Sequence, residues 1–391
     1  MVTGNTISPT PVSPLSDAVT INGSGITASK VSVAAGNTQG VTFYAGNFGG
    51  SFLSTMGNNL FDGSGTNGAW TIATGDGNDT INGTNGTNNI RAGDGNNVIN
   101  LGAGANFVSS EGQDTITGVE NASDTVTILG GNSIVSLKSN SLVVDSALSG
   151  SQISVGINST VFGGTGSTVN FTSQTGSIVG AVGDTISAAG NLQVTHGTDQ
   201  SISVSGALQF ISGTGNTSIN AGLGTIWGAN DLRATVNTKG LALFTANQPS
   251  TTGSQYIDAS SSAGTLEAWT GAGNNTIIGT SGSDHFVFGT QFENSNGNSY
   301  ATVTGGSGAA NTFGVLNGHN GGDITITDFG SAAGNMFFMY NYKPADADKA
   351  IADLLATATI SGGNTTLQLD NNMKVTFLGV TDLKASNFTI S

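Results

Sequence analysis

The sequence predicts an all-β fold, a right-handed parallel β-roll or β-solenoid with nonapeptide repeats, capped by a C-terminal hairpin and one short helix. Three observations predict it. Glycine accounts for 61 of 391 residues, and charged residues for only 8%, unlike ordinary globular proteins. Short alternating runs of Ser, Thr and Asn with single apolar residues are typical of short strands. Residues 74–109 form four consecutive blocks of nine: TGDGNDTIN, GTNGTNNIR, AGDGNNVIN and LGAGANFVS.

Each block of nine is expected to form half of one coil. Its glycine-rich half makes a turn, because glycine adopts turn conformations at little steric cost. The other half is a short strand, whose apolar residue at the eighth position faces inward: Ile81, Ile90, Ile99 and Val108. Two blocks complete a coil, and successive coils stack as parallel strands about 4.8 Å apart.

This stacking predicts that alternate blocks share one edge of the roll. The first edge carries Asp76, Asp79, Asp94, Asn97 and Asp114. Carboxylate, amide and turn carbonyl oxygens are the ligands that calcium prefers. The second edge carries Asn85, Asn88, Ala103 and Asn106, with no carboxylate in these blocks, and is expected to stack as a neutral amide ladder.

Asn97 is expected to separate two like charges on the first edge. Carboxylates one coil apart repel by about 1 kcal/mol in water and by about 3.5 kcal/mol at an effective dielectric of about 20. The amide between Asp79 and Asp114 relieves that repulsion. We therefore expect one or two calcium sites rather than a full column, with a metal-free glycine-rich solenoid as the alternative.

A second, shorter array follows at Thr270–Ile278 and Gly279–Val287, with Asn275 and Asp284 at the sixth positions. It is expected to be a weaker calcium site than the first array unless Gly305, Gly306 or Asp323 supplies the next turn. The predicted metal residues of both arrays are Gly75, Asp76, Gly77, Asp79, Gly93, Asp94, Gly95, Asn97, Asp114, Gly282 and Asp284.

The chain divides into four expected segments. Residues 1–20 form an extended arm containing Pro9, Pro11 and Pro14. Residues 21–120 form a strand-rich flank and the first array, and residues 121–265 an irregular solenoid, for which a β-sandwich is the competing fold. Residues 266–391 hold the second array and the cap. In the cap, Pro344 opens a helix with Ala347, Ala350, Ile351, Leu354 and Leu355 on one face, and a hairpin turns around Asn371 and Asn372.

Charge and cysteine content limit the possible partners and compartments. The formal net charge is −15, so nucleic acid and anionic membranes are poor partners, whereas metal cations are favoured. Cysteine is absent, so neither disulfides nor thiolate metal sites can stabilise the fold. No positively charged, apolar signal is present at the N-terminus, and no apolar run approaches membrane-spanning length.

The nonapeptides, together with DITITDFGSAAGNMFFMY at 323–340 and LQLDNNMKVTFLGVTDLKASNF at 367–388, resemble the RTX (repeats-in-toxin) family. In that family an Ile-Thr-Asp-Phe segment, a hairpin and a short apolar tail follow the repeats and carry an uncleaved type I secretion signal. Ile326–Phe329 and Phe388–Ser391 occupy those places here. The resemblance implies export from a Gram-negative cell and folding outside it, where calcium is about millimolar.

Members of the family often carry an enzyme, but the residues here predict none. No H-E-x-x-H helix or G-x-S-x-G elbow is present, and His196, His285 and His319 lie far apart in the sequence. Glu111, Glu120, Glu267 and Glu293 have no spacing that favours a paired-carboxylate glycosidase, and with nine Lys and Arg residues the chain has little to hold a polyuronate.

The sequence therefore predicts a secreted structural protein that self-assembles with calcium into a surface layer, filament or biofilm matrix. Its partners would be copies of itself, with Thr3–Thr20 donated to a neighbouring sheet. The alternative is a secreted adhesin or carbohydrate-binding module, in which Trp70, Trp227 or Trp269 stacks on sugar rings, although single tryptophans more often close solenoid ends. Ice binding would need a longer flat array of Thr or Asn.

Overall fold

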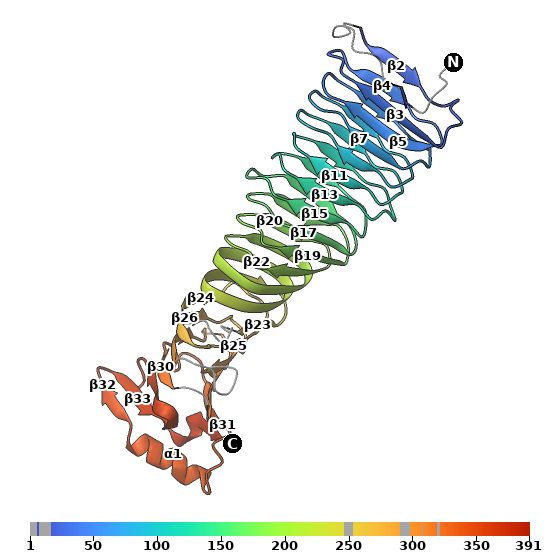
Figure 1. The fold of residues 1–391 in the computed structure, drawn as a ribbon. Coiled ribbons are helices and arrows are strands. Elements are labelled where there is room, and N and C mark those ends of the chain that lie inside the picture. The colour runs from blue at the N-terminus through green and yellow to red at the C-terminus, as the bar shows by residue number, and fades with distance from the viewer. Residues whose placement is uncertain (1–5, 8–16, 246–252, 290–297, 307, 319–320) are drawn as a thin grey trace. The chain divides into compact units, whose positions relative to one another are not determined.

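The protein is an all-β parallel β-solenoid with one short α-helix (Figure 1). The computed structural model describes residues 6–7, 17–245, 253–289, 298–306, 308–318 and 321–391. The chain separates into two compact units, Met1–Asn191 (unit one) and Leu192–Ser391 (unit two). The four segments expected from the sequence stay predictions.

Unit one is a stack of short strands in which each strand pairs in parallel with the second strand after it. Thus Ile81 of β8 pairs with Ile99 of β10, and Ile99 pairs with Ile116 of β12. Its strands are β1 (Thr6–Ile7), β2 (Val19–Asn22), β3 (Lys30–Ala35), β4 (Val41–Tyr44), β5 (Gly49–Ser54), β6 (Leu60–Asp62), β7 (Trp70–Ala73), β8 (Thr80–Asn82), β9 (Asn89–Arg91), β10 (Val98–Asn100), β11 (Phe107–Ser110), β12 (Thr115–Thr117), β13 (Thr125–Ile128), β14 (Ile134–Ser136), β15 (Leu142–Asp145), β16 (Gln152–Val155), β17 (Ser159–Phe162), β18 (Thr168–Phe171), β19 (Thr175–Val179) and β20 (Thr185–Ala188).

The core of unit one follows from the period of two in each strand. The eighth residues of the four blocks, Ile81, Ile90, Ile99 and Val108, are buried, as predicted. Beyond residue 120 the strands keep the same parallel pairing, so this part of the chain is a solenoid, and the sandwich alternative is wrong for it.

Large aromatic side chains fill the first coils of unit one. Phe43, Phe52, Phe61 and Trp70 are almost fully buried, and their ring centroids lie 5.1 to 5.8 Å apart in the contacting pairs. The Trp70 Nε1–H group donates a hydrogen bond of 2.9 Å to the carbonyl oxygen of Phe48. Trp70 is thus a core residue and cannot stack on a glycan.

Unit two continues the parallel pairing with longer strands. They are β21 (Asn191–Thr195), β22 (Ser201–Thr238), β23 (Ala242–Thr245), β24 (Ser254–Asp258), β25 (Leu266–Trp269), β26 (Gly273–Ile278), β27 (His285–Phe288), β28 (Ser299–Thr304), β29 (Thr312–Leu316), β30 (Gly322–Ile326), β31 (Met336–Tyr340), β32 (Thr359–Ser361), β33 (Asn364–Gln368), β34 (Met373–Phe377) and β35 (Phe388–Ile390). The long element β22 winds through the stack, because it pairs with β21 early in its length and with β23 and β24 later.

The C-terminal end of unit two is capped as predicted. Strands β33 and β34 form an antiparallel hairpin, joined by the 3₁₀ turn η1 (Asp370–Asn372), and β34 pairs with β30. The helix α1 (Ala347–Ala356) is capped by Asp346, whose side chain accepts a hydrogen bond from the Lys349 amide, so it begins three residues after Pro344 rather than at it. It contacts β33 and η2 (Ala385–Asn387).

Candidate metal centre

Three of the five first-edge residues form one buried column inside the turns. Asp79, Asn97 and Asp114 precede β8, β10 and β12, and each is 1% exposed. The Asp79 amide donates to Asn97 Oδ1 over 2.8 Å, and the Asn97 amide donates to Asp114 Oδ1 over 3.0 Å. Each side chain thus satisfies a backbone donor of the coil before it.

Glycine allows these turns to approach one another closely. Gly75 and Gly93 have φ values of 72° and 76°, in the left-handed region. A Cβ atom on Gly93 would lie 2.1 Å from the carbonyl oxygen of Gly75. Side chains are therefore excluded from the contact between neighbouring turns.

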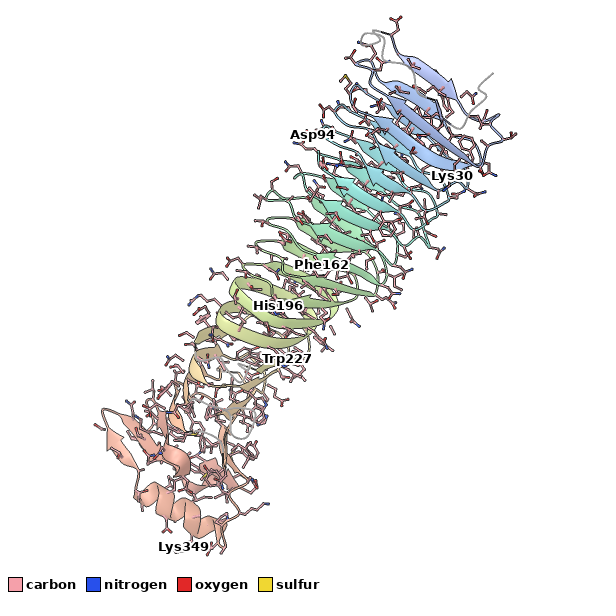
Figure 2. All side chains as sticks on the ribbon, in the orientation of Figure 1. Lys30, Asp94, Phe162, His196, Trp227 and Lys349 are labelled. Carbon is pink, nitrogen blue, oxygen red and sulfur yellow. The ribbon has the colours of Figure 1, made fainter. Side chains whose placement is uncertain are left out.

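The other predicted first-edge ligands lie outside the column. Asp76 and Asp94 are exposed on the outer side of their turns, and Figure 2 labels Asp94. They line a shallow hollow of about 320 Å³ together with Arg91 and Glu111. Arg91 Nη2 lies 2.7 Å from Glu111 Oε1, which places a positive charge beside this hollow. The structure thus brings together Asp79, Asn97 and Asp114, but not Asp76 and Asp94.

The second edge forms the expected amide ladder. Asn88 Nδ2 donates to Asn106 Oδ1 over 2.8 Å, and Asn106 Nδ2 donates to Asp124 Oδ1 over 2.9 Å. Asn85 and Ala103, like Asp76 on the first edge, are exposed. The ladder ends on a carboxylate, Asp124, which lies beyond the nonapeptide blocks and was not among the predicted residues.

In the second-edge turns an asparagine amide donates to the inward carbonyl oxygens. Asn106 Nδ2 donates to the carbonyl oxygens of Gly102 and Gly104, over 3.2 and 2.8 Å. Asn88 Nδ2 makes the matching pair of bonds to Thr84 and Gly86. The turns at Asn88 and Asn106 therefore satisfy these carbonyl oxygens with side-chain amides.

Asp79 fits calcium best among the predicted residues. Its Oδ1 accepts hydrogen bonds from the Asn59 amide and Asn59 Nδ2, over 2.7 and 2.9 Å. Its Oδ2 is buried and has no hydrogen-bond partner. Burial is the main cause that raises the pKa of Asp79, and the charge of Asp114 adds to it. A cation bound to Oδ2 would remove both costs.

The remaining predicted carboxylates are already hydrogen-bonded. Asp114 Oδ2 accepts the Ser110 hydroxyl over 2.6 Å. In unit two, Asp284 Oδ1 accepts the Leu266 amide and the Thr280 hydroxyl, and Asp284 Oδ2 accepts the Thr280 amide. Burial raises the pKa of both carboxyl groups.

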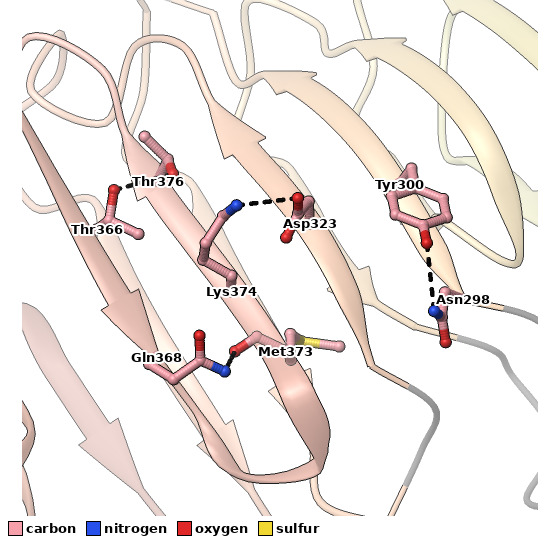
Figure 3. A network of polar contacts seen from close by, with 8 residues as sticks. All are labelled: Asn298, Tyr300, Asp323, Thr366, Gln368, Met373, Lys374 and Thr376. Carbon is pink, nitrogen blue, oxygen red and sulfur yellow. Dashed lines mark hydrogen bonds and ion pairs between the residues drawn. The ribbon is translucent and has the colours of Figure 1, made fainter.

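Of the three residues expected to supply the turn next to Asp284, Gly305 and Gly306 do so. Gly305 and Gly306 stack on the turn at Thr280, since a Cβ on Gly306 would lie 2.3 Å from the Thr280 carbonyl oxygen. Their amides donate to the carboxylate of Asp328, each over 2.8 Å. Asp323 was the wrong candidate: it lies in β30 and pairs with Lys374 Nζ at 2.9 Å (Figure 3).

Comparison with protein families matches the RTX calcium-binding nonapeptide repeat (HemolysinCabind) in four copies, over residues 73–108 and 268–291. The chain carries RTX nonapeptide repeats. Comparison with curated proteins gives no significant match. RTX nonapeptide repeats bind Ca²⁺, and the matched residues include both arrays predicted from the sequence.

The RTX turns suit calcium more than a metal that needs several charged ligands. In the part of the chain that the structure describes, no three His, Cys, Asp or Glu residues gather in a metal-binding group. Calcium accepts backbone carbonyls and amide oxygens beside one carboxylate. Asp79, with the surrounding turn carbonyls, is therefore the residue of the first array that would hold it.

Sequence reasoning missed one member of the RTX column, Asn59. It lies in the coil before the first predicted block, and its Nδ2 donates to the carbonyl oxygens of Gly57 and Thr74. The signal was present, because Gly57-Asn58-Asn59-Leu60-Phe61 aligns with Gly77-Asn78-Asp79-Thr80-Ile81, with the same Gly-Asn pair, an amide in the place of Asp79 and an apolar residue at the end. No helix of the described residues is long and apolar enough to cross a membrane.

Proposed function

We propose that this RTX-repeat protein is a secreted, calcium-dependent structural subunit of a Gram-negative bacterium, which assembles with copies of itself into a surface layer, filament or matrix. The RTX repeats support calcium binding and are typical of secreted proteins. The apolar core of the molecule holds the stacked coils together. Its net charge of −15 favours cations over polyanions as partners. A non-enzymatic role is part of this proposal.

The N-terminal end of unit one carries the assembly proposal. Val19 and Ile21 of β2 are only half-buried, whereas Phe43, the β4 partner of Ile21, is fully buried. Among the described residues, β2 pairs with β4 alone, which leaves its other edge available for another strand. An unpaired edge with a partly exposed apolar face is a template for a strand from another chain.

The N-terminal arm offers such a strand. Thr6 and Ile7 pair in parallel with Ser32 and Val33 of β3, although most of the arm lies outside the described residues. A segment that pairs in this way within one chain can pair in the same register with a neighbour. End-to-end assembly through this arm would also cover the edge of β2.

Deleting Thr3–Thr20 should abolish assembly while the solenoid still folds. Light scattering at millimolar calcium measures assembly, and circular dichroism measures the retained β signal. A control that replaces the arm with a Gly/Ser linker of equal length should also fail to assemble, because the linker cannot form the strand. Polymers that form unchanged without the arm would rule this mode of assembly out.

A groove in unit two favours carbohydrate binding as the second candidate. It has a volume of about 400 Å³ and crosses β22, β24, β26, β28 and β30. Arg233 stacks on the Tyr256 ring at 4.8 Å, and Tyr300 is 42% exposed. The charge of Asp323 at its border is paired with Lys374, as Figure 3 shows. Exposed rings among hydroxyls and amides suit an uncharged sugar chain.

The tryptophans are less suited to this role than these tyrosines. Trp70 is buried, whereas Trp227 and Trp269 are half-buried and lie outside this groove. Trp227 of β22 and Trp269 of β25 both pair with Thr245 of β23, one on each side. The groove, rather than the tryptophans, therefore supports the carbohydrate candidate.

Replacing Tyr300 with alanine tests the groove. If it binds sugars, the wild-type protein is retarded in native gels that contain a soluble β-glucan or a galactomannan, and Tyr300→Ala reduces that retardation several-fold, because a stacked ring contributes about 1 kcal/mol or more. Tyr44→Ala is the control, since Tyr44 is 40% exposed in unit one. Equal mobility of the wild type with and without both polysaccharides would remove this candidate.

A further inference from the structure

The first coils of unit one carry a hollow on their outer face, which we call the outer hollow. It has a volume of about 640 Å³, and its lining residues come from β3, β5, β7, β9 and β11 and from the turns that precede β7 and β9. These five strands are successive neighbours in one sheet. Four strand spacings of about 4.8 Å make a span of about 19 Å, so the hollow runs along the stack of coils and not along one strand.

The floor of the outer hollow is a row of short polar side chains in register: Ser32, Ser51, Thr71 and Asn89. The hydroxyl groups of Ser32 and Ser51 lie 2.9 Å apart and bond to one another. Within the described part of the chain, the side chains of Thr71 and Asn89 make no hydrogen bond, so their donors and acceptors remain available to a ligand. Hydroxyl and amide groups in a row suit the hydroxyl groups of a sugar chain.

A cation and an aromatic ring lie at opposite ends of this row. Lys30 of β3 is exposed, and Figure 2 labels it. The ion pairs of the described residues do not include Lys30. Phe107 of β11, the partner of Asn89, is 50% exposed. A free ammonium group suits a carboxylate, and an exposed ring suits the apolar face of a sugar ring.

The charge of the outer hollow contrasts with that of the whole molecule. The chain has a net charge of −15, yet none of the described residues that line the hollow is Asp or Glu. Lys30 can pair with one carboxylate, whereas a polyanion would be repelled by the acidic remainder of the chain. An extended peptide fits less well, because a peptide strand adds to the edge of a sheet, and this hollow lies on the face of a sheet whose strands are already paired.

We propose that the outer hollow binds an acidic oligosaccharide, a chain of neutral sugar rings that carries one carboxylate group. Lys30 pairs with the carboxylate, the floor residues bond to sugar hydroxyl groups, and Phe107 stacks on a ring. The site is separate from the groove of unit two. It is also independent of the proposed assembly function, because it uses the face of the sheet and not the edge of β2.

Two tetrasaccharides of equal length test the assigned chemistry. One is xylotriose with a glucuronic acid branch, and the other is the neutral xylotetraose. Isothermal titration calorimetry of the full chain in calcium should show an affinity about five-fold or more higher for the acidic sugar, since a charged hydrogen bond contributes about 1 kcal/mol or more. This preference should shrink in about 1 M NaCl, because salt screens exposed charges.

Variants of the two end residues assign the binding to this hollow. Lys30→Met should remove the preference for the acidic sugar and keep the affinity for xylotetraose, whereas Lys30→Arg should keep the preference. Phe107→Ala should weaken the binding of both sugars several-fold, because both stack on its ring. Lys138→Met is the matched control, since Lys138 is an exposed lysine of unit one that does not line the hollow.

Tyr300→Ala separates this site from the carbohydrate candidate in unit two. It should leave both affinities unchanged, because Tyr300 lines the other groove. Equal affinity of the wild type for the two sugars, no binding of either, or a preference that persists in Lys30→Met would overturn the proposal.

Discussion

In EDTA the protein will be more stable at about pH 5 than at about pH 7.5, and millimolar calcium will remove that difference. Burial raises the pKa of Asp79, Asp114, Asp124, Asp184 and Asp284 above their ordinary value. The folded state therefore holds more protons than the unfolded state in the window between the two pKa values. Because protons stabilise the state that binds more of them, stability is lost as the pH rises through that window.

Asp184 gives the scale of this effect. Its pKa rises from 3.8 to about 6. That shift alone makes the free energy of unfolding about 1 kcal/mol larger at pH 5 than at pH 7.5 in EDTA, and the other four groups add to it. Calcium replaces the protons as the compensating charge, so it should act mainly at the higher pH.

Urea unfolding followed by circular dichroism measures both parts of this prediction. Titrations at the two pH values, in EDTA and in calcium, give four midpoints, of which the one in EDTA at the higher pH should be clearly the lowest. Magnesium is the ionic control, because it prefers a rigid octahedral shell that these turns do not supply. A midpoint in EDTA that rises with pH would contradict the assigned protonation of the buried carboxyl groups.

Replacing Trp70 with alanine will destabilise unit one by about 3–5 kcal/mol, the usual cost of removing a large buried aromatic side chain. Trp70 is 2% exposed, and its ring lies 5.3 Å from Phe43 and 5.1 Å from Phe61 between centroids. The change also leaves the carbonyl oxygen of Phe48 without its Nε1–H donor. Neighbouring coils cannot collapse into the cavity, because their backbones are fixed by the strand ladder.

The matched control for Trp70→Ala is Trp227→Ala in unit two, because Trp227 is half-buried and makes a smaller core contribution. Urea unfolding by circular dichroism should show a large shift of the unit-one transition for the first variant and a smaller effect for the second. A Trp70→Ala midpoint equal to that of the wild type would mean that the aromatic cluster does not hold the first coils together.

The strand ladder could be predicted because its period is local. Ile81 and Ile99 lie opposite one another since each block contains the same number of residues, and no long-range information is needed to align them. The helix and the hairpin likewise follow from Asp346 and from the two runs around the η1 turn. Where the nine-residue period is interrupted, as at β22, the sequence predicts short strands but does not predict the register in which they pair.

The candidate site was only partly predictable for a related reason. Asp79 and Asp114 are correctly placed in one column, but Asp76 faces outward, because the third residue of a block lies on the outer side of the turn. Asp124 lies on the second edge and Asp184 on the first. Each follows a turn whose length differs from that of the repeat turns. The residues that contact these two carboxyl groups are set by the stacking of coils. The sequence does not reveal that stacking where the nonapeptide repeat is interrupted.

The buried aromatic residues are unevenly distributed along the chain, and this affects where the protein opens. Phe43, Phe52, Phe61 and Trp70 lie within the first coils of unit one, whereas Val135, Val143, Ile153 and Val161 fill the coils from β14 to β17, before the buried Phe171 of β18. In a solenoid each coil is held only by its neighbours, so local core volume sets local resistance to separation. Fraying from the amino-terminal side is therefore suppressed. A mechanical load or a protease would first open the coils whose core consists of Val and Ile side chains.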